Sequence, residues 1–229
     1  MGRSIHLNTA RMQCIGAWLA EPESTPKGGI VVVQEIFGVN AHIRAVTECF
    51  AAHGYTAIAP AFFDHVETGV ELGYDEAGFA RGRELVGEIG VDLALADVAS
   101  AAEAIASAGR IGCVGYCWGG TIAFLAATRL GLPAVSYYGA RNVGFLDEKP
   151  RAPVEFHFGA QDPSIPSAAI ERHREALPDA PVHVYPAGHA FNRDVDPDPY
   201  DATSATLAFE RTLAFFEHNL RAPRDGGER

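Results

Sequence analysis

The sequence lacks any long apolar segment. Among its 229 residues, no apolar run approaches the roughly 20 residues that a membrane-spanning helix requires. The segment Met1–Leu7 carries one arginine but no apolar stretch of the length found in signal peptides. We therefore expect a cytoplasmic protein with no membrane partner.

Cysteine is also scarce. The four cysteines are Cys14, Cys49, Cys113 and Cys117, and only the last two lie close together, in a C-x-x-x-C spacing. This spacing fits neither a redox C-x-x-C motif nor a zinc framework. We expect free thiols, no metal and no cofactor, so a single reactive cysteine is the feature to look for.

Positive charge is in short supply as well. The 18 Lys and Arg residues against 29 Asp and Glu residues give a formal net charge of −11. A uniformly negative field repels phosphate, which excludes a general nucleic-acid partner. A small anionic substrate would need a local cluster of arginines to overcome this field.

Apolar runs of strand length alternate with helical segments. The expected strands are Gly29–Val33, Tyr55–Pro60, Ile111–Val114, Ala134–Tyr138, Val154–Phe158 and Val182–Tyr185. The expected helices are Ala41–His53, Asp92–Ala108, Thr121–Arg129 and Ala202–Asn219, and residues 62–90 are expected to be loop and polar helix. This alternation is typical of an α/β protein with a mostly parallel sheet and helices on both faces. Without a repeat or linker, one domain over residues 1–220 and a polar tail over residues 221–229 are the simplest organisation.

A cysteine flanked by small residues follows one of the expected strands. Residues 115–120 read GYCWGG, which matches the nucleophile elbow G-x-S-x-G with Cys117 in place of serine. The small neighbours permit a tight strand-to-helix turn, and the helix N-terminus then favours the thiolate of Cys117. The backbone N–H of Trp118 would be one oxyanion donor. The alternative is a buried structural cysteine in a glycine-rich turn.

Two further residues stand at strand ends in the order that α/β-hydrolases use, which is nucleophile, acid, histidine. Asp162 follows the strand Val154–Phe158, and His189 follows the strand Val182–Tyr185. Taken singly, Asp162 is equally a turn-forming residue before a proline, and His189 a solvated loop histidine. Together with Cys117 they predict a catalytic triad.

Three segments resemble one known family. QEIFGVN at residues 34–40, GYCWGG at residues 115–120 and AGHAF at residues 187–191 are similar to motifs of the dienelactone hydrolase (carboxymethylenebutenolidase) family. The resemblance covers roughly residues 28–216. It implies an α/β-hydrolase fold and a ring-opening reaction from dienelactone to maleylacetate without metal or cofactor. It assigns Cys117 as nucleophile, His189 as base and Asp162 as the residue that orients the base.

The resemblance also extends to the loop after the first expected strand. It implies that Glu35 contacts the resting thiol and helps to form the thiolate when substrate binds. A carboxylate beside sulfur disfavours a second negative charge, so the physics agrees. The N–H of Ile36 is the matching second oxyanion donor. The alternative for Glu35 is a solvated loop carboxylate.

Family members hold a substrate carboxylate with two arginines. Arg193, four residues after His189, matches one position. The other falls near residues 80–85, where Arg81 and Arg83 both compete. The aromatic residue expected shortly afterwards is absent from residues 84–87, which read ELVG. This departure leaves the exact substrate open.

A cysteine nucleophile restricts the substrate class independently of any resemblance. A thiol has a pKa of about 8.5, whereas a simple alkoxide is far more basic, with a conjugate acid near the ~15.7 of water. The thiolate is expelled in preference to an alkoxide, so enol lactones, aryl esters and thioesters are favoured. Together with this argument, the resemblance implies a small lactone or ester that carries a carboxylate, and a monomer or small homo-oligomer. A thioesterase, an aryl-ester hydrolase and a non-catalytic binding protein are the alternatives.

Overall fold

The computed structural model describes residues 1–9 and 13–221, so residues 222–229 of the expected tail lie outside the described residues. Its centre is an eight-stranded sheet with the order β1-β2-β4-β3-β5-β6-β7-β8. The strands are β1 Arg3–Asn8, β2 Cys14–Ala20, β3 Gly29–Val33, β4 Thr56–Pro60, β5 Ile111–Tyr116, β6 Ala134–Tyr137, β7 Val154–Gly159 and β8 Val182–Tyr185. Strand β2 pairs antiparallel with both β1 and β4, and β3 to β8 pair in parallel. The parallel strands therefore bring their carboxyl ends to one edge of the sheet.

Helices connect the parallel strands. They are α1 Ala41–Ala52, α2 Glu76–Ala104, α3 Trp118–Leu125, α4 Ser167–Ala176 and α5 Ala202–Leu220. Short helical turns are η1 Phe62–His65, η2 Ala106–Ala108, η3 Ala126–Leu130 and η4 Asn142–Phe145. Side chains cap three N-termini: Asn40 accepts from the Ile43 amide in α1, and Asp75 and Asp201 do the same in α2 and α5. Helix α2 bends at Gly90, which has a φ of 65°.

The predicted α/β-hydrolase architecture is confirmed, and the expected strands agree with β3 to β8. Strands β1 and β2 were not expected, because buried and accessible residues alternate along them instead of forming continuous apolar runs. Helix α4 agrees with a helical segment around His173, for which no bounds were expected because only Ile170 and His173 are buried in it. The expected helix at 92–108 is the second half of α2 followed by η2.

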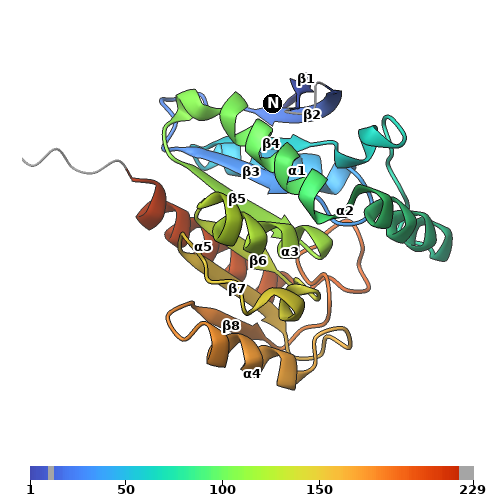
Figure 1. Ribbon diagram of the computed structural model, residues 1–229, viewed down its shortest axis with the longest axis vertical. Coiled ribbons are helices and arrows are strands. Elements are labelled where there is room, and N and C mark those ends of the chain that lie inside the picture. The colour runs from blue at the N-terminus through green and yellow to red at the C-terminus, as the bar shows by residue number, and fades with distance from the viewer. Residues whose placement is uncertain (10–12, 222–229) are drawn as a thin grey trace, which may run out of the picture.

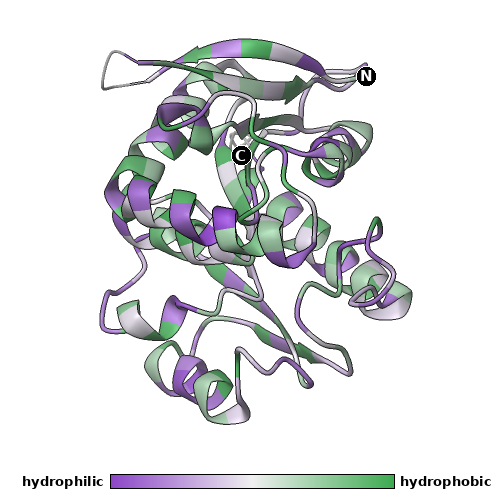
Figure 2. Cartoon of the chain, turned by 90° about the vertical axis from the view of Figure 1, so that its right-hand side faces the viewer, coloured by the Kyte–Doolittle hydropathy of each residue, from purple (hydrophilic) through white to green (hydrophobic). Residues whose placement is uncertain are grey.

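The helices form two layers around the sheet (Figure 1). Helix α3 packs on β5, β6 and α2 on one side, and α5 packs on β5 and β7. Phe50 of α1 contacts Phe209 of α5, with ring centroids 5.3 Å apart, so these two helices share a layer. Figure 2 shows helices striped with hydrophobic and hydrophilic residues around this sheet. Every residue of β3 and β4 is buried, as expected for strands covered on both faces.

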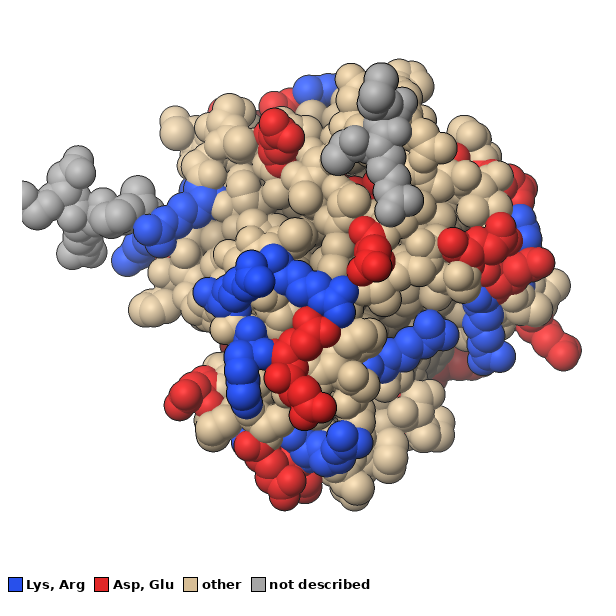
Figure 3. Space-filling view, viewed as in Figure 1, with Lys and Arg blue, Asp and Glu red and all other residues tan. Residues whose placement is uncertain are grey.

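The surface carries interspersed charges. On the face seen in Figure 3, several basic side chains adjoin one another near the centre, and acidic side chains lie directly beside them. Among the described residues, no helix combines the length and the apolar character needed to cross a membrane.

Candidate active site

Cys117 stands in a strained turn between β5 and α3. Its φ is 56° and ψ is −115°, a conformation that costs energy for any residue with a Cβ. Three glycines permit the turn: a Cβ at Gly115 would lie 1.8 Å from the Gly119 carbonyl oxygen, at Gly119 2.4 Å from the Gln34 oxygen, and at Gly120 2.4 Å from the Tyr137 oxygen. The GYCWGG motif is therefore explained by backbone packing around the cysteine.

His189 and Asp162 lie in line with the sulfur. The Nε2 atom of His189 is 3.2 Å from Cys117 Sγ, and its Nδ1 is 2.6 Å from Asp162 Oδ2. Asp162 is 4 % exposed, and its other oxygen accepts the Ser164 amide at 2.8 Å. The sequence prediction that these three residues converge from separate strand ends agrees with this geometry. Such a chain can move a proton between the sulfur and the imidazole while the carboxylate fixes the ring.

The pKa of His189 reflects these neighbours. Burial alone would lower the pKa, but the hydrogen bonds and charges of Asp162 and Cys117 more than offset burial and raise it to about 10. The raised pKa of His189 favours the protonated ring at neutral pH.

Backbone strain gathers at this site. Among the described residues, the non-glycine residues with positive φ are Cys117, Tyr138 at 38° and Ala190 at 60°. Tyr138 directly follows β6, and its ring lies 5.0 Å from the His189 ring. Its hydroxyl is buried with no partner among the described residues, and burial followed by the charge of Glu35 raises its pKa well above the usual value.

Glu35 is a buried partner of Arg193. It is 1 % exposed, against 5 % for Arg193. The Nη1 atom of Arg193 lies 3.4 Å from both carboxylate oxygens of Glu35, and its Nη2 lies 2.8 Å from Asp196 Oδ2. Burial opposes the charge on Arg193, but Glu35 and Asp196 raise its pKa. The structure thus excludes the alternative of a solvated loop carboxylate for Glu35.

Aromatic rings surround the same guanidinium. The Arg193 guanidinium carbon is 4.1 Å from the centre of the Tyr74 ring and 5.4 Å from that of Phe37. The Tyr74 hydroxyl accepts a hydrogen bond from the Asn40 side chain at 2.9 Å. Burial, followed by the charge of Glu35, raises the pKa of Tyr74 to about 12. An aromatic neighbour of a candidate substrate-binding arginine is therefore present, on the loop before α2 and not after Arg81 or Arg83.

Arg81 and Arg83 lie on α2 and flank Gly82. Arg81 pairs with Glu67 at 2.9 Å and with Glu84 at 2.6 Å, whereas Arg83 is exposed. A Cβ at Gly82 would lie 2.1 Å from the Ile36 carbonyl oxygen, so this helix touches the loop of the expected oxyanion donor. Substrate contact by Arg81 or Arg83 stays a prediction.

The two expected oxyanion donors lie on either side of the elbow. Trp118 is the first residue of α3, so its N–H is one of those without an acceptor inside the helix. Its ring packs against Phe62 and Phe63 of η1, with centroids 5.6 and 6.4 Å away. Ile36 follows β3 and is 8 % exposed. Their role as oxyanion donors stays a prediction.

The remaining cysteines have other surroundings. Cys113 lies inside β5 and is fully buried, and burial raises the pKa of its thiol. Cys14 and Cys49 are free thiols on β2 and α1. Of the four cysteines, Cys117 is the one that stands beside an imidazole held by a carboxylate.

The fold and the arrangement of these groups define the class of protein: the chain is an α/β-hydrolase. Residues 15–220 match the Dienelactone hydrolase family, so the chain belongs to that family. It is 34 % identical to a carboxymethylenebutenolidase of Pseudomonas putida over 212 residues, covering 87 % of this chain and 89 % of the relative. It is 31 % identical to carboxymethylenebutenolidase 1 of Cupriavidus pinatubonensis over 210 residues, covering 86 % and 89 %. Membership indicates a hydrolase of esters or lactones.

Solved structures agree with this assignment. A crystal structure from Klebsiella pneumoniae, described as a candidate dienelactone hydrolase, matches with a TM-score of 0.83 and 32 % identity, covering 94 % of this chain and 98 % of the other. A dienelactone hydrolase-like promiscuous phosphotriesterase from metagenomic libraries matches with a TM-score of 0.75 at 20 % identity, covering 95 % and 98 %. At this lower identity the likeness shows the fold alone.

Proposed function

We propose that this protein opens an enol lactone through a cysteine acyl-enzyme. The observation that carries the proposal is the alignment of Cys117, His189 and Asp162, with 3.2 Å from sulfur to imidazole and 2.6 Å from imidazole to carboxylate. The thiolate of Cys117 attacks the lactone carbonyl and forms a carbon–sulfur bond. The oxyanion is held by the N–H groups of Ile36 and Trp118.

The intermediate then breaks the ring carbon–oxygen bond. The enolate oxygen, which stays part of the acyl chain on Cys117, takes a proton from the protonated His189 ring, and the imidazole becomes neutral. Water attacks this thioester while His189 takes the water proton and Asp162 keeps the ring oriented. The carbon–sulfur bond breaks, which releases the acid and restores Cys117.

Glu35 and Arg193 connect substrate binding to the nucleophile. In the resting site Arg193 is occupied by Glu35 and Asp196. The family resemblance implies that Glu35 also faces the Cys117 thiol, where a carboxylate disfavours the thiolate. A substrate carboxylate that takes the Nη1 side of Arg193 releases Glu35 to accept the thiol proton. Thiolate formation is thereby linked to the arrival of an anionic substrate.

A thioesterase or an aryl-ester hydrolase is the second candidate function. Both substrates have leaving groups that a thiolate can expel, and the same three residues serve them. A non-catalytic binding protein has no use for three residues aligned at these distances. The cytoplasmic location, the monomer or small homo-oligomer, and the absence of metal and cofactor stay predictions.

The decisive experiment is the consumption of cis- and trans-dienelactone, followed by ultraviolet absorbance, with wild-type and Cys117→Ala protein. We expect rapid turnover by the wild type and a loss of at least about 10³-fold in the variant. Cys113→Ala is the matched control, because it removes a thiol that lies inside β5. Activity of Cys117→Ala within tenfold of wild type would refute the proposal. Cleavage of p-nitrophenyl acetate that depends on Cys117, without lactone turnover, would favour the second candidate.

A further inference from the structure

The guanidinium of Arg193 faces two carboxylates instead of one. Asp196 Oδ2 lies 2.8 Å from Nη2, whereas both Glu35 oxygens lie 3.4 Å from Nη1. The Arg193, Glu35 and Asp196 side chains are 6, 2 and 18 % exposed. One positive charge therefore shares a largely buried space with two negative charges.

The two carboxylates are attached to the molecule in different ways. Asp196 lies three residues after Arg193, and its amide donates to the Arg193 carbonyl at 3.2 Å. Glu35 comes from the loop after β3, far away in sequence. Asp196 therefore belongs to the same turn as Arg193, and its contact with the guanidinium is the shorter one. Of the two partners, Glu35 is the one that a substrate can replace.

We infer that Asp196 is a specificity-determining residue that limits how tightly the site binds a carboxylate. The inference rests on the proposed function, in which Arg193 receives the substrate carboxylate. The trio of Arg193, Glu35 and Asp196 carries a net charge of −1 before the substrate arrives. When the substrate carboxylate takes the place of Glu35 and Glu35 accepts the thiol proton, Asp196 is the charged carboxylate left in the trio. It then repels the substrate carboxylate, whereas a neutral substrate is not repelled.

The size of the effect follows from the distances. A substrate carboxylate on Arg193 would stand about 5 Å from Asp196, where like charges repel appreciably in a partly buried site. Solvent access to Asp196 reduces this repulsion. Removing the charge should therefore improve binding of an anionic substrate roughly three- to tenfold.

Asp196→Asn tests this inference, because asparagine keeps an oxygen that accepts from Arg193 and loses only the charge. Two substrates of matched length are the p-nitrophenyl monoester of glutaric acid and p-nitrophenyl valerate. We expect KM for the anionic ester to fall three- to tenfold, with kcat unchanged and the neutral ester unaffected. Asp194→Asn is the matched control, because Asp194 is 60 % exposed and pairs with His42. Asp194→Asn should change KM for neither ester by more than about twofold.

An unchanged or raised KM for the anionic ester in Asp196→Asn would overturn the inference, as would an equal change with both esters. Arg193→Ala separates this failure from that of the proposed function. If Arg193→Ala does not reduce kcat/KM for the anionic ester, the proposed role of Arg193 fails and the inference with it. If Arg193→Ala reduces kcat/KM for the anionic ester while Asp196→Asn leaves its KM unchanged, only the inference about Asp196 fails. Calorimetric binding of glutarate to Cys117→Ala protein, with and without Asp196→Asn, gives the same comparison without turnover.

Discussion

The two edges of the central sheet differ in what they hold. At the carboxyl edge, the loops after the parallel strands gather Cys117, Asp162 and His189, the residues with strained backbone, and the buried pair of Glu35 and Arg193. Few of these groups are freely accessible, since the His189 side chain is only 26 % exposed. Charged side chains and strained backbone conformations are therefore concentrated at the carboxyl edge of the sheet.

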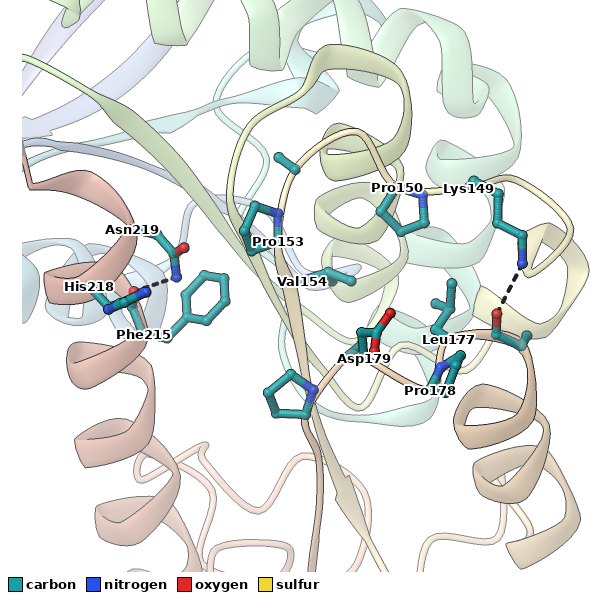
Figure 4. Close-up of a pocket in the computed structure, with 14 residues that line it drawn as sticks. Lys149, Pro150, Pro153, Val154, Leu177, Pro178, Asp179, Phe215, His218 and Asn219 are labelled. Carbon is teal, nitrogen blue, oxygen red and sulfur yellow. Dashed lines mark hydrogen bonds between the residues drawn. The ribbon is translucent and has the colours of Figure 1, made fainter. Parts of the chain in front are cut away.

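The opposite edge holds a wide groove of about 810 Å³. Figure 4 shows it between the C-terminal ends of α4 and α5, where β7 and β8 begin. Its walls are mainly apolar, with Pro150, Pro153, Pro178, Leu177 and Phe215. Lys149 donates to the Ala176 carbonyl at 3.1 Å.

In this molecule the large groove and the converging polar side chains lie at different edges of the sheet. The groove is large, but no described triad of nucleophile, base and acid lines it. The catalytic edge stores several kcal/mol of backbone strain, since each non-glycine residue at positive φ costs about 1–3 kcal/mol. The scaffold must offset this cost with buried surface elsewhere. The candidate active site is therefore marked by converging polar groups and backbone strain, and not by cavity volume.

The largest expected effect at the catalytic edge, after loss of the nucleophile, comes from Asp162→Asn. The variant loses the charge that stabilises the protonated ring and fixes its tautomer, so kcat/KM should fall about 10²–10⁴-fold. Since Asp162 helps to raise the pKa of His189 to about 10, the ring should titrate at a lower pH in the variant. The checks are kcat/KM for p-nitrophenyl acetate from pH 6 to 10 and the NMR titration of the ring.

Asp179→Asn makes the same chemical change at the groove. Asp179 is exposed and lines the groove at the opposite edge. The kcat/KM of the Asp179→Asn variant should therefore stay within about twofold of wild type. Equal losses in the two variants would show that the edges are not functionally distinct.

The catalytic edge was largely predictable from the sequence. The carboxyl ends of parallel strands meet at one edge, so residues one to four positions after β5, β7 and β8 are brought to the same edge of the sheet. The glycines around Cys117 mark the tight turn, and the order of the three residues completes the prediction.

The neighbours of Arg193 were not predictable in this way. Tyr74 reaches the guanidinium from the loop before α2, and Asp196 from a turn after His189, so their contacts depend on loop conformation. The positive φ of Tyr138 and Ala190 has no local sequence signal, because neither is a glycine. Tyr74 lies seven residues before Arg81 and nine before Arg83, a spacing that identifies it as a neighbour of Arg193 only when the loop geometry is known.

A medium effect is expected on stability, not on rate, from Glu155→Gln in the scaffold. Glu155 lies in β7, 2.9 Å from His157 Nε2 and 3.5 Å from His183 Nε2. Burial would raise the pKa of Glu155, but hydrogen bonds from the two histidines prevail and lower it to about 2. Burial lowers the pKa of His157 itself, which favours the neutral form of this ring.

The sign of the pH dependence follows from this lowered pKa. The ionised Glu155 stabilises the folded state fully above pH 4.5, and the stabilisation disappears as pH falls toward 2. Glu155→Gln should therefore reduce the free energy of unfolding by about 2 kcal/mol at pH 7 and by much less at pH 3. Urea denaturation at both pH values measures this change in the free energy of unfolding. Glu175→Gln is the control, because Glu175 is exposed. A penalty that does not shrink at pH 3 would contradict the ionic origin.

The smallest effect is expected from His218→Gln in the groove. His218 is exposed in the last turn of α5, where a cation interacts with the helix dipole by only about 0.3–1 kcal/mol. We expect kcat/KM within twofold of wild type and a change of less than about 1 kcal/mol in the free energy of unfolding. Steady-state kinetics with p-nitrophenyl acetate and urea denaturation check both. A tenfold change in kcat/KM with unchanged stability would break the comparison, because the groove would then be coupled to the catalytic edge through α5 and β7.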